Sequence, residues 1–274
     1  MVKNKFSVSM CVYGKDEPTW FNQAVQSVLN QTVQPDEVVL VVDGPVPEEL
    51  DAIIKKYEGD SRFNVVRFEE NQGHGNARRR SVQECKNDII ALMDADDISV
   101  ENRFEKQLEC LISENADIVG GNIAEFIGTT DNIVGYRRVP EQHEDIIDYM
   151  KTRCPFNQMT VMFKKEAYLK AGGYIDWYCD EDYYLWLRMM QNDAQFKNVN
   201  EVLVFARVGE EMYQRRGGIR YFKSEAKLQK YMLDNKIIGF GTYFMNVAKR
   251  LVLQVLLPNS IRGWVFKKFA RDKE

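Results

Sequence analysis

The stretch Ile89-Ile90-Ala91-Leu92-Met93-Asp94-Ala95-Asp96-Asp97 decides the fold that we expect and the chemistry that goes with it. Its apolar first half is typical of a buried parallel strand, and three carboxylates follow within four positions, where an open α/β sheet places its ligand crevice. Asp94 and Asp96 can converge on one hard cation if the chain turns between them, and carboxylate oxygens suit Mg²⁺ or Mn²⁺. The alternative is a solvated acidic turn in which Asp96 or Asp97 caps the next helix.

The residues before this stretch alternate between strand and helix patterns. Strands are predicted at Phe6–Tyr13, Asp36–Val42 and Asn64–Phe68, and the apolar residues between them recur at helical spacing from Phe21 to Leu29 and from Leu50 to Tyr57. Repeated β-α-β units predict an α/β fold with a doubly wound, mostly parallel sheet. The loops after Tyr13, Val42, Phe68 and Met93 should then gather along one edge of the sheet.

A dinucleotide-dependent dehydrogenase is the default interpretation of such a sheet, but it requires G-x-G-x-x-G after the first strand. The loop after Tyr13 contains only Gly14. Phosphate handling is therefore expected from a metal held by Asp94 and Asp96.

The second half of the chain contains another acidic triplet, Asp180-Glu181-Asp182, between two aromatic clusters. A helix with Phe104 and Leu108 on one face and the apolar piece 118–122 precede it, whereas strand pairing between residues 129 and 162 is not predicted. Asp180 is expected to be the N-cap of a helix that contains Trp186, and helix capping alone would explain one or two of these carboxylates. A carboxylate among aromatic rings can also have a pKa high enough for proton transfer, which favours Asp182 as a base.

The composition excludes some classes of protein. The chain has 274 residues, a net charge of -4, 45% hydrophobic and 28% charged residues, and five cysteines, none of them in C-x-x-C. The negative charge argues against nucleic acid as a partner. The cysteines predict neither a disulfide framework nor a zinc site, and residues 1–5 lead into a strand without a signal-peptide pattern. We expect a cytoplasmic protein without a membrane span, which acts at the inner face of the cell membrane if its C-terminal region binds there.

The C-terminal region is helical and basic in pattern. Apolar residues recur at helical spacing from Tyr243 to Val255, Pro258 is expected to separate two short helices, and Lys and Arg are frequent around them. One interpretation is peripheral contact with anionic lipids, in which Trp264, Phe266 and Phe269 insert. The other is that the first helix packs on the rest of the protein and the lysines form a solvated face.

Seven short motifs, in a fixed order, resemble the inverting glycosyltransferases of family 2 with a GT-A fold, in the bacterial exopolysaccharide, capsule and O-antigen branch that includes amylovoran-type enzymes. They are Val8-Ser9-Met10-Cys11-Val12-Tyr13, Ser27-Val28-Leu29-Asn30-Gln31-Thr32, Val42-Asp43-Gly44, Asn71-Gln72-Gly73 with Ala77-Arg78, Asp94-Ala95-Asp96-Asp97, Ala171-Gly172-Gly173-Tyr174, and Glu181-Asp182-Tyr183 with Leu185-Trp186.

The resemblance implies a role for each matching residue. Tyr13 would lie beside the uracil of a nucleotide sugar, Asp43 would contact the base, Arg78 would face the nucleotide and Asp94 would lie near the ribose. Asp96 would bind Mn²⁺ or Mg²⁺, and Asp182 would be the general base. Three further residues are expected on the acceptor side or supporting the base: Glu181, Trp177 and Asn157. Two departures are Val42, where the family usually has a second acidic residue, and Gln158, where it often has histidine.

The resemblance further implies a nucleotide-sugar-binding half in residues 1–100, an acceptor-binding half in residues 101–218 and a helical extension in residues 219–274. The expected reaction is transfer of a hexose, of galactose or glucose type, from a UDP-sugar to a hydroxyl of a lipid-linked oligosaccharide in surface polysaccharide synthesis. The alternatives are a sugar-phosphate nucleotidyltransferase and a non-catalytic nucleotide-sugar-binding module. The motifs identify neither the sugar, nor the acceptor and its linkage position, nor the oligomeric state.

Overall fold

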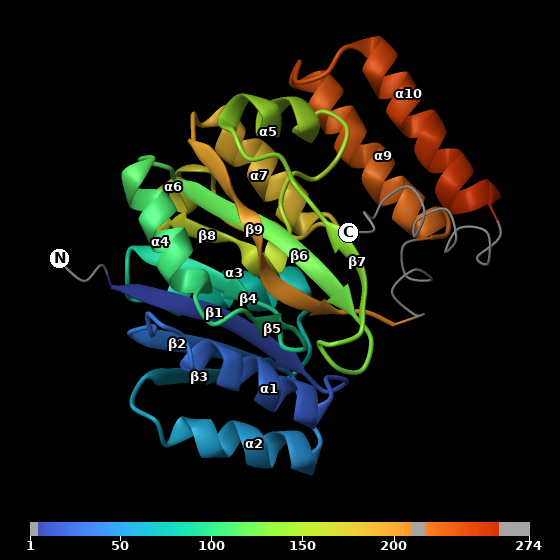
Figure 1. Cartoon of the computed structure of the whole chain (residues 1–274). Helices are drawn as coiled ribbons and strands as arrows, with labels where there is room; N and C mark the ends of the chain where they lie inside the picture. The colour runs from blue at the N-terminus through green and yellow to red at the C-terminus, as the bar shows by residue number, and fades with distance from the viewer. Residues whose placement is uncertain (1–4, 210–216, 258–274) are drawn as a thin grey trace.

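The computed structural model describes residues 5–209 and 217–257, which are built around one twisted β-sheet (Figure 1). Four parallel strands form its first half: β1 (Phe6–Tyr13), β2 (Glu37–Asp43), β3 (Phe63–Arg67) and β4 (Ile89–Met93). The register pairs Tyr13 with Asp43 and Met10 with Met93. The carboxyl ends of these strands therefore meet at one edge of the sheet, as the sequence predicts.

The second half of the sheet is mixed, and its strands come from four places in the chain. They are β5 (Ile98–Ser99), β6 (Ile118–Phe126), β7 (Ile133–Arg137), β8 (Met162–Lys164) and β9 (Phe196–Arg207). The strand order is β3-β2-β1-β4-β8-β6-β9-β5, with β7 paired to β6, and the pairings β4–β8, β6–β8, β6–β7 and β5–β9 are antiparallel. Parallel pairing dominates up to β4, whereas the second half combines these antiparallel pairs with a parallel β6–β9 ladder. The antiparallel β6 and β7 form a hairpin, which needs no crossover helix.

Helices cover both faces of the sheet. One face carries α1 (Pro18–Leu29), α2 (Glu48–Glu58) and α4 (Arg103–Ser113), and the other carries α3 (His74–Glu84), α5 (His143–Met150), α6 (Lys165–Lys170) and α7 (Glu181–Gln191). Alternate residues of β2 belong to different cores, with Val38 on the α1 side and Val39 on the α7 side. This arrangement follows from the period-2 geometry of a strand and confirms the doubly wound α/β fold.

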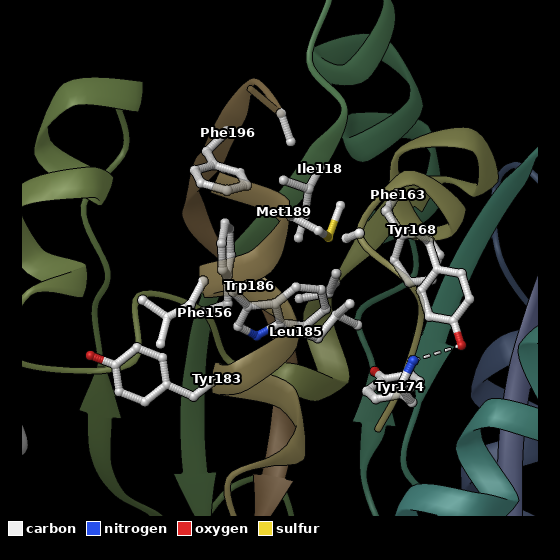
Figure 2. Packing of buried hydrophobic residues seen from close by; sticks show 14 of the residues in the cluster. Ile118, Phe156, Phe163, Tyr168, Tyr174, Tyr183, Leu185, Trp186, Met189 and Phe196 are labelled. Atoms are coloured by element: carbon white, nitrogen blue, oxygen red, sulfur yellow. Dashed lines mark hydrogen bonds between the residues drawn. The ribbon is translucent and has the colours of Figure 1, made fainter. Parts of the chain in front are cut away.

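The core on the α7 side is the aromatic one (Figure 2). Trp186 is fully buried at its centre, with its ring 5.6 Å from that of Phe156 in an edge-to-face arrangement. The short 3₁₀ helix η1 (Gln158–Thr160) follows Phe156 and leads into β8. Packing of Trp186 therefore fixes α7, and with it the acidic residues at the start of that helix.

The last described helices, α9 (Ile219–Asp234) and α10 (Phe240–Leu251), form an antiparallel pair beside α5 and α7, and the π-helical turn η2 (Val252–Leu256) follows (Figure 1). Leu228 and Met232 of α9 are buried in the aromatic core, so the helical extension shares a core with the rest of the protein. Trp264, Phe266, Phe269 and the helix expected after Pro258 lie outside the described residues. Within residues 5–209 and 217–257, no helix is both long and apolar enough to cross a membrane.

Candidate active site

The loop after β2 is held together by the Asp43 carboxylate. Its two oxygens accept the backbone N–H groups of Gln72 and Gly73 at 2.7 and 3.1 Å, and the Asn71 side chain donates to the Asp43 carbonyl at 3.1 Å. Gly44 has φ of +87°, and a Cβ there would lie 2.6 Å from the Asn71 backbone nitrogen. Two loops therefore pack against each other here, the one that contains Val42-Asp43-Gly44 and the one that contains Asn71-Gln72-Gly73. Asp43 has a structural role here in addition to the base contact that the resemblance implies.

Tyr13 lies next to Asp43 in the sheet register and ends β1 with a half-exposed side chain. Its backbone N–H donates to the Asp16 carboxylate at 2.9 Å, which closes the turn into α1. The ring therefore stands at the strand-end edge, and its contact with a nucleotide base stays a prediction from the resemblance.

The three carboxylates after β4 diverge. Asp94 is ion-paired with Arg78, whereas Asp97 is buried and accepts the backbone N–H of Arg207 at 2.8 Å. Burial, together with the neighbouring Asp96 and Asp94, raises the pKa of Asp97 well above its ordinary value. Asp96 lies between them with a partly exposed side chain, and its carbonyl accepts the Arg207 Nε–H at 3.0 Å. Asp97 is therefore an internal residue, and Asp96 is the carboxylate of the triplet best placed to receive a ligand.

Arg207, at the end of β9, is a site residue that the sequence did not predict. Its guanidinium lies over the rings of Trp20 and Phe126 and also donates to the Gln23 side chain and the Gly128 carbonyl. Burial lowers its pKa. Arg207 is 110 positions from Asp97 in the sequence. No short sequence motif therefore indicates that Arg207 hydrogen-bonds the acidic turn.

Arg78 of α3 joins the two acidic motifs. Its Nη2 lies 2.9 Å from Asp94 Oδ1 and its Nη1 lies 2.9 Å from Glu181 Oε1, and the guanidinium is largely buried. Burial works to lower the pKa of Arg78, but the two carboxylates hold it above its ordinary value. The end of β4 and the start of α7 are therefore connected through one charged group, 16 positions from Asp94 and 103 from Glu181.

Asp182 lies in the first turn of α7, beside this ion-pair network. Its Oδ1 accepts the N–H of Tyr183 at 2.6 Å. Burial raises its pKa, while the positive charge of Arg78 opposes that increase. Asp180 occupies the N-cap position, as predicted, but its side chain makes no capping hydrogen bond. The pKa of Asp182 is thus shifted in the direction that favours proton transfer, and its role as a base stays a prediction.

The other candidates on the acceptor side differ in their surroundings. Trp177 packs on Tyr184 with ring centroids 4.5 Å apart, close to the start of α7. Asn157 is buried, and its amide donates to the Gly121 carbonyl at 2.8 Å, so it links η1 to β6. Gln158, at the position where the family often has histidine, donates to the Tyr174 hydroxyl at 2.7 Å.

Protein ligands alone do not make a metal site in the part of the chain that the structure describes, because no three His, Cys, Asp or Glu side chains converge there. Asp94 is ion-paired with Arg78 and Asp97 is buried, whereas the Asp96 side chain is partly exposed, which makes Asp96 the candidate carboxylate of the triplet for a cation. A site for Mg²⁺ or Mn²⁺ at this edge would need oxygen atoms from a substrate phosphate as well, which is the usual arrangement for Mg²⁺.

Comparisons with known proteins agree with this geometry. The sequence profile of glycosyl transferase family 2 matches residues 7–171. The chain is 36% identical over 269 residues to the UDP-Gal:alpha-D-GlcNAc-diphosphoundecaprenol beta-1,3-galactosyltransferase of Escherichia coli, with 97% of each chain covered. It is 33% identical over 266 residues to the amylovoran biosynthesis glycosyltransferase AmsE of Erwinia amylovora, with 96% of this chain and 98% of that one covered.

Among solved structures, the fold is similar to residues 1–349 of Staphylococcus aureus TarS, determined in complex with UDP-GlcNAc. The TM-score is 0.66 at 16% sequence identity, with 90% of this chain and 72% of that chain covered. At this identity the likeness concerns the fold alone, and it confirms the predicted GT-A architecture. Together with the profile match and the relatives above 30% identity, it shows that the chain is a glycosyltransferase and belongs to family 2.

Proposed function

We propose that this glycosyltransferase transfers a hexose, of galactose or glucose type, from a UDP-sugar to a hydroxyl of a lipid-linked oligosaccharide, with inversion at the anomeric carbon. One observation carries the proposal: the Asp94–Arg78–Glu181 link places the strand-end edge, where a nucleotide would bind, beside the partly buried carboxylate of Asp182. The E. coli relative, whose name specifies UDP-Gal and a GlcNAc-diphospholipid, supports this choice of substrates.

In this mechanism Asp182 accepts the proton of the acceptor hydroxyl as that oxygen attacks the anomeric carbon from the face opposite the departing UDP. A base is most effective when its pKa approaches the working pH, and burial moves the pKa of Asp182 in that direction. Direct displacement requires no covalent bond between sugar and protein. Tyr13 and the loop closed by Asp43 would bind the uridine at the edge formed by β1 and β2.

A divalent cation fits the donor side of the site. Asp96 would hold Mn²⁺ or Mg²⁺ together with the two phosphates of the donor, since one carboxylate with phosphate oxygens is a common donor set for these ions. When bound, the ion would neutralise the negative charge that develops on the departing diphosphate. Arg207 supports this role of Asp96 by fixing the main chain of the acidic turn.

The alternatives make different predictions about product formation. A sugar-phosphate nucleotidyltransferase would make a nucleotide sugar from a nucleoside triphosphate, and a binding module would release no UDP. The test is a panel of UDP-galactose, UDP-glucose and their N-acetyl forms with Mn²⁺ and a GlcNAc-diphospholipid acceptor, with UDP release as the readout. We expect acceptor-dependent UDP release from a hexose donor. Release only from N-acetylated donors, or nucleotide-sugar synthesis from a triphosphate, would contradict the proposal.

We further propose that the reaction takes place at the inner face of the cell membrane, which the C-terminal helices contact peripherally. Phe240, Phe244 and Leu251 recur along α10 with exposed side chains. The sequence after residue 257 adds five basic residues against two acidic ones, Asp272 and Glu274. An apolar helix face next to positive charge suits an anionic lipid surface.

Flotation with anionic vesicles at low and moderate salt tests this contact. Replacing Phe240 and Phe244 by serine, and in a second protein removing residues 259–274, should each reduce binding. Ile112→Ser, at an exposed apolar position of α4, is the matched control and should bind like the parent. If parent, truncated protein and control all fail to float, the C-terminal region serves packing and solubility only.

A further inference from the structure

One stripe of α9 faces the segment that contains the proposed base. The side chains of Arg220, Ser224, Lys227 and Tyr231 follow one another at spacings of four, three and four residues, which places them on the same face of the helix. Each contacts a residue between positions 177 and 191. We name these four residues the α9 stripe.

Two of the contacts are cation–π interactions with the aromatic cluster before α7. Lys227 Nζ lies 4.2 Å from the centroid of the Trp177 ring, and the Arg220 guanidinium lies 4.0 Å from that of Tyr178. Trp177 is also packed on Tyr184, so its ring lies between a lysine of α9 and a tyrosine of α7. The Trp177 ring is thereby fixed from both helices.

The other contacts hold the backbone and the start of α7. The Ser224 hydroxyl donates to the Tyr178 carbonyl, and Ser224 lies beside the buried Asp180 carboxyl. Glu225 faces the same carboxyl and is ion-paired with Arg250 of α10 at 2.7 Å, where both side chains are mostly buried. Asp180 therefore makes contacts with the α9–α10 pair in place of the capping bond to its own helix.

We propose that α9 is the positioning element of the acceptor side: the α9 stripe holds residues 177–184 so that Asp182 is aligned with the acceptor hydroxyl. Lys227 acts through Trp177, and Ser224 acts through Tyr178 and Asp180. None of the four residues of the stripe takes part in the chemistry. This inference rests on the proposed role of Asp182 and adds to it an element that lies outside the family profile, which ends at residue 171.

The chain offers a matched pair of substitutions on one helix. Lys227→Ala removes the contact with Trp177, whereas Lys230→Ala, three residues later, removes a lysine that pairs with the exposed Asp234 of its own helix. Lys227→Arg retains a cation over the ring and serves as the conservative rescue. The first measurement is hydrogen–deuterium exchange in the peptide that covers residues 177–184, which does not depend on any reaction.

We expect faster exchange in that peptide for Lys227→Ala and parent-like exchange for Lys230→Ala and Lys227→Arg. With UDP-galactose and a GlcNAc-diphospholipid, kcat/KM for the acceptor should fall about two- to fivefold in Lys227→Ala, the factor that corresponds to one lost cation–π contact. KM for the UDP-sugar should be unchanged, because the lost contact is with Trp177 and the ion pair between Arg78 and Asp94 remains. Ser224→Val should lower kcat further, with the same unchanged donor KM.

The outcomes separate this inference from the proposed function. If Lys227→Ala and Lys230→Ala exchange alike, the α9 stripe does not hold the segment and the inference is wrong, whatever the parent catalyses. If exchange rises but acceptor kinetics are those of the parent, the contact is structural and the inference is also wrong. An Asp182→Asn protein with parent-like transfer would instead overturn the proposed function.

Discussion

Replacing Arg78 by glutamine should remove the ion pairs that connect the end of β4 to the start of α7. The substitution should therefore destabilise the protein. In the parent, Arg78 is within 2.9 Å of both Asp94 and Glu181, and the side chains of these two carboxylates are 27% and 9% exposed. Removing one partner of a buried ion pair costs about 3–5 kcal/mol, because the remaining charge loses its compensation. Water can still solvate Asp94, so we expect a loss near the lower end, about 3 kcal/mol.

The pH dependence of this loss has a defined sign. Burial raises the pKa of Glu181, and Arg78 is the main influence that lowers it, so the substitution should raise that pKa further. A carboxyl whose pKa is higher in the folded state than in the unfolded state opposes folding when ionised, and this cost disappears as the pH falls and the group becomes protonated. The difference in unfolding free energy between parent and variant should therefore shrink from about pH 7.5 to about pH 5.

Urea unfolding of the two proteins at both pH values measures the effect. Arg80→Gln is the matched control, because Arg80 lies on the same helix and makes an exposed ion pair with Glu84. That pair is worth at most about 0.5 kcal/mol. Equal stability of Arg78→Gln and Arg80→Gln, or a loss that is the same at both pH values, would refute the reasoning.

Three further substitutions test the roles proposed for single residues. Asp182→Asn should retain UDP-sugar binding in a titration and lose transfer by about a hundredfold or more, the usual contribution of a general base; transfer within about tenfold of the parent would mean that another group is the base. Asp96→Ala should abolish metal-dependent turnover with an unchanged circular-dichroism spectrum, since the residue lies in a turn beyond β4, and full activity in Mn²⁺ would contradict the metal assignment. Asp43→Ala should weaken UDP binding far more than it lowers kcat, because two hydrogen bonds that order the loop at Gln72 and Gly73 are lost; unchanged UDP affinity in a binding titration would contradict this.

The sequence predicted the strands and loops of the proposed donor side well because these depend on short-range patterns. β1 spans the predicted residues, and the predicted bounds of β2 and β3 differ from the observed ones by one residue. Parallel strands whose loops follow at the same end must bring those loops together, whatever the details of packing. Tyr13, Asp43 and the acidic turn after β4 were therefore expected at one edge before any contact was known.

The acceptor side and the connections between the halves depend on contacts that a local pattern does not contain. The β6–β7 hairpin and the two-residue strand β5 lie where the apolar alternation is weak. The resemblance assigned Arg78 to the nucleotide, and its ion pair with Glu181 became visible only in three dimensions. Asn157 has the polarity of a site residue, but its amide is used inside the protein.

The position of Arg78 also bears on the proposed role of Asp182 as a base. Burial raises the pKa of its carboxyl, and only the ionised carboxylate can accept the proton of an acceptor hydroxyl. The nearby guanidinium lowers the pKa, but not to its ordinary value, so burial remains the stronger influence. Because Asp94 and Glu181 hold that guanidinium in place, the residues that join the two halves of the site also act on the pKa of the proposed base.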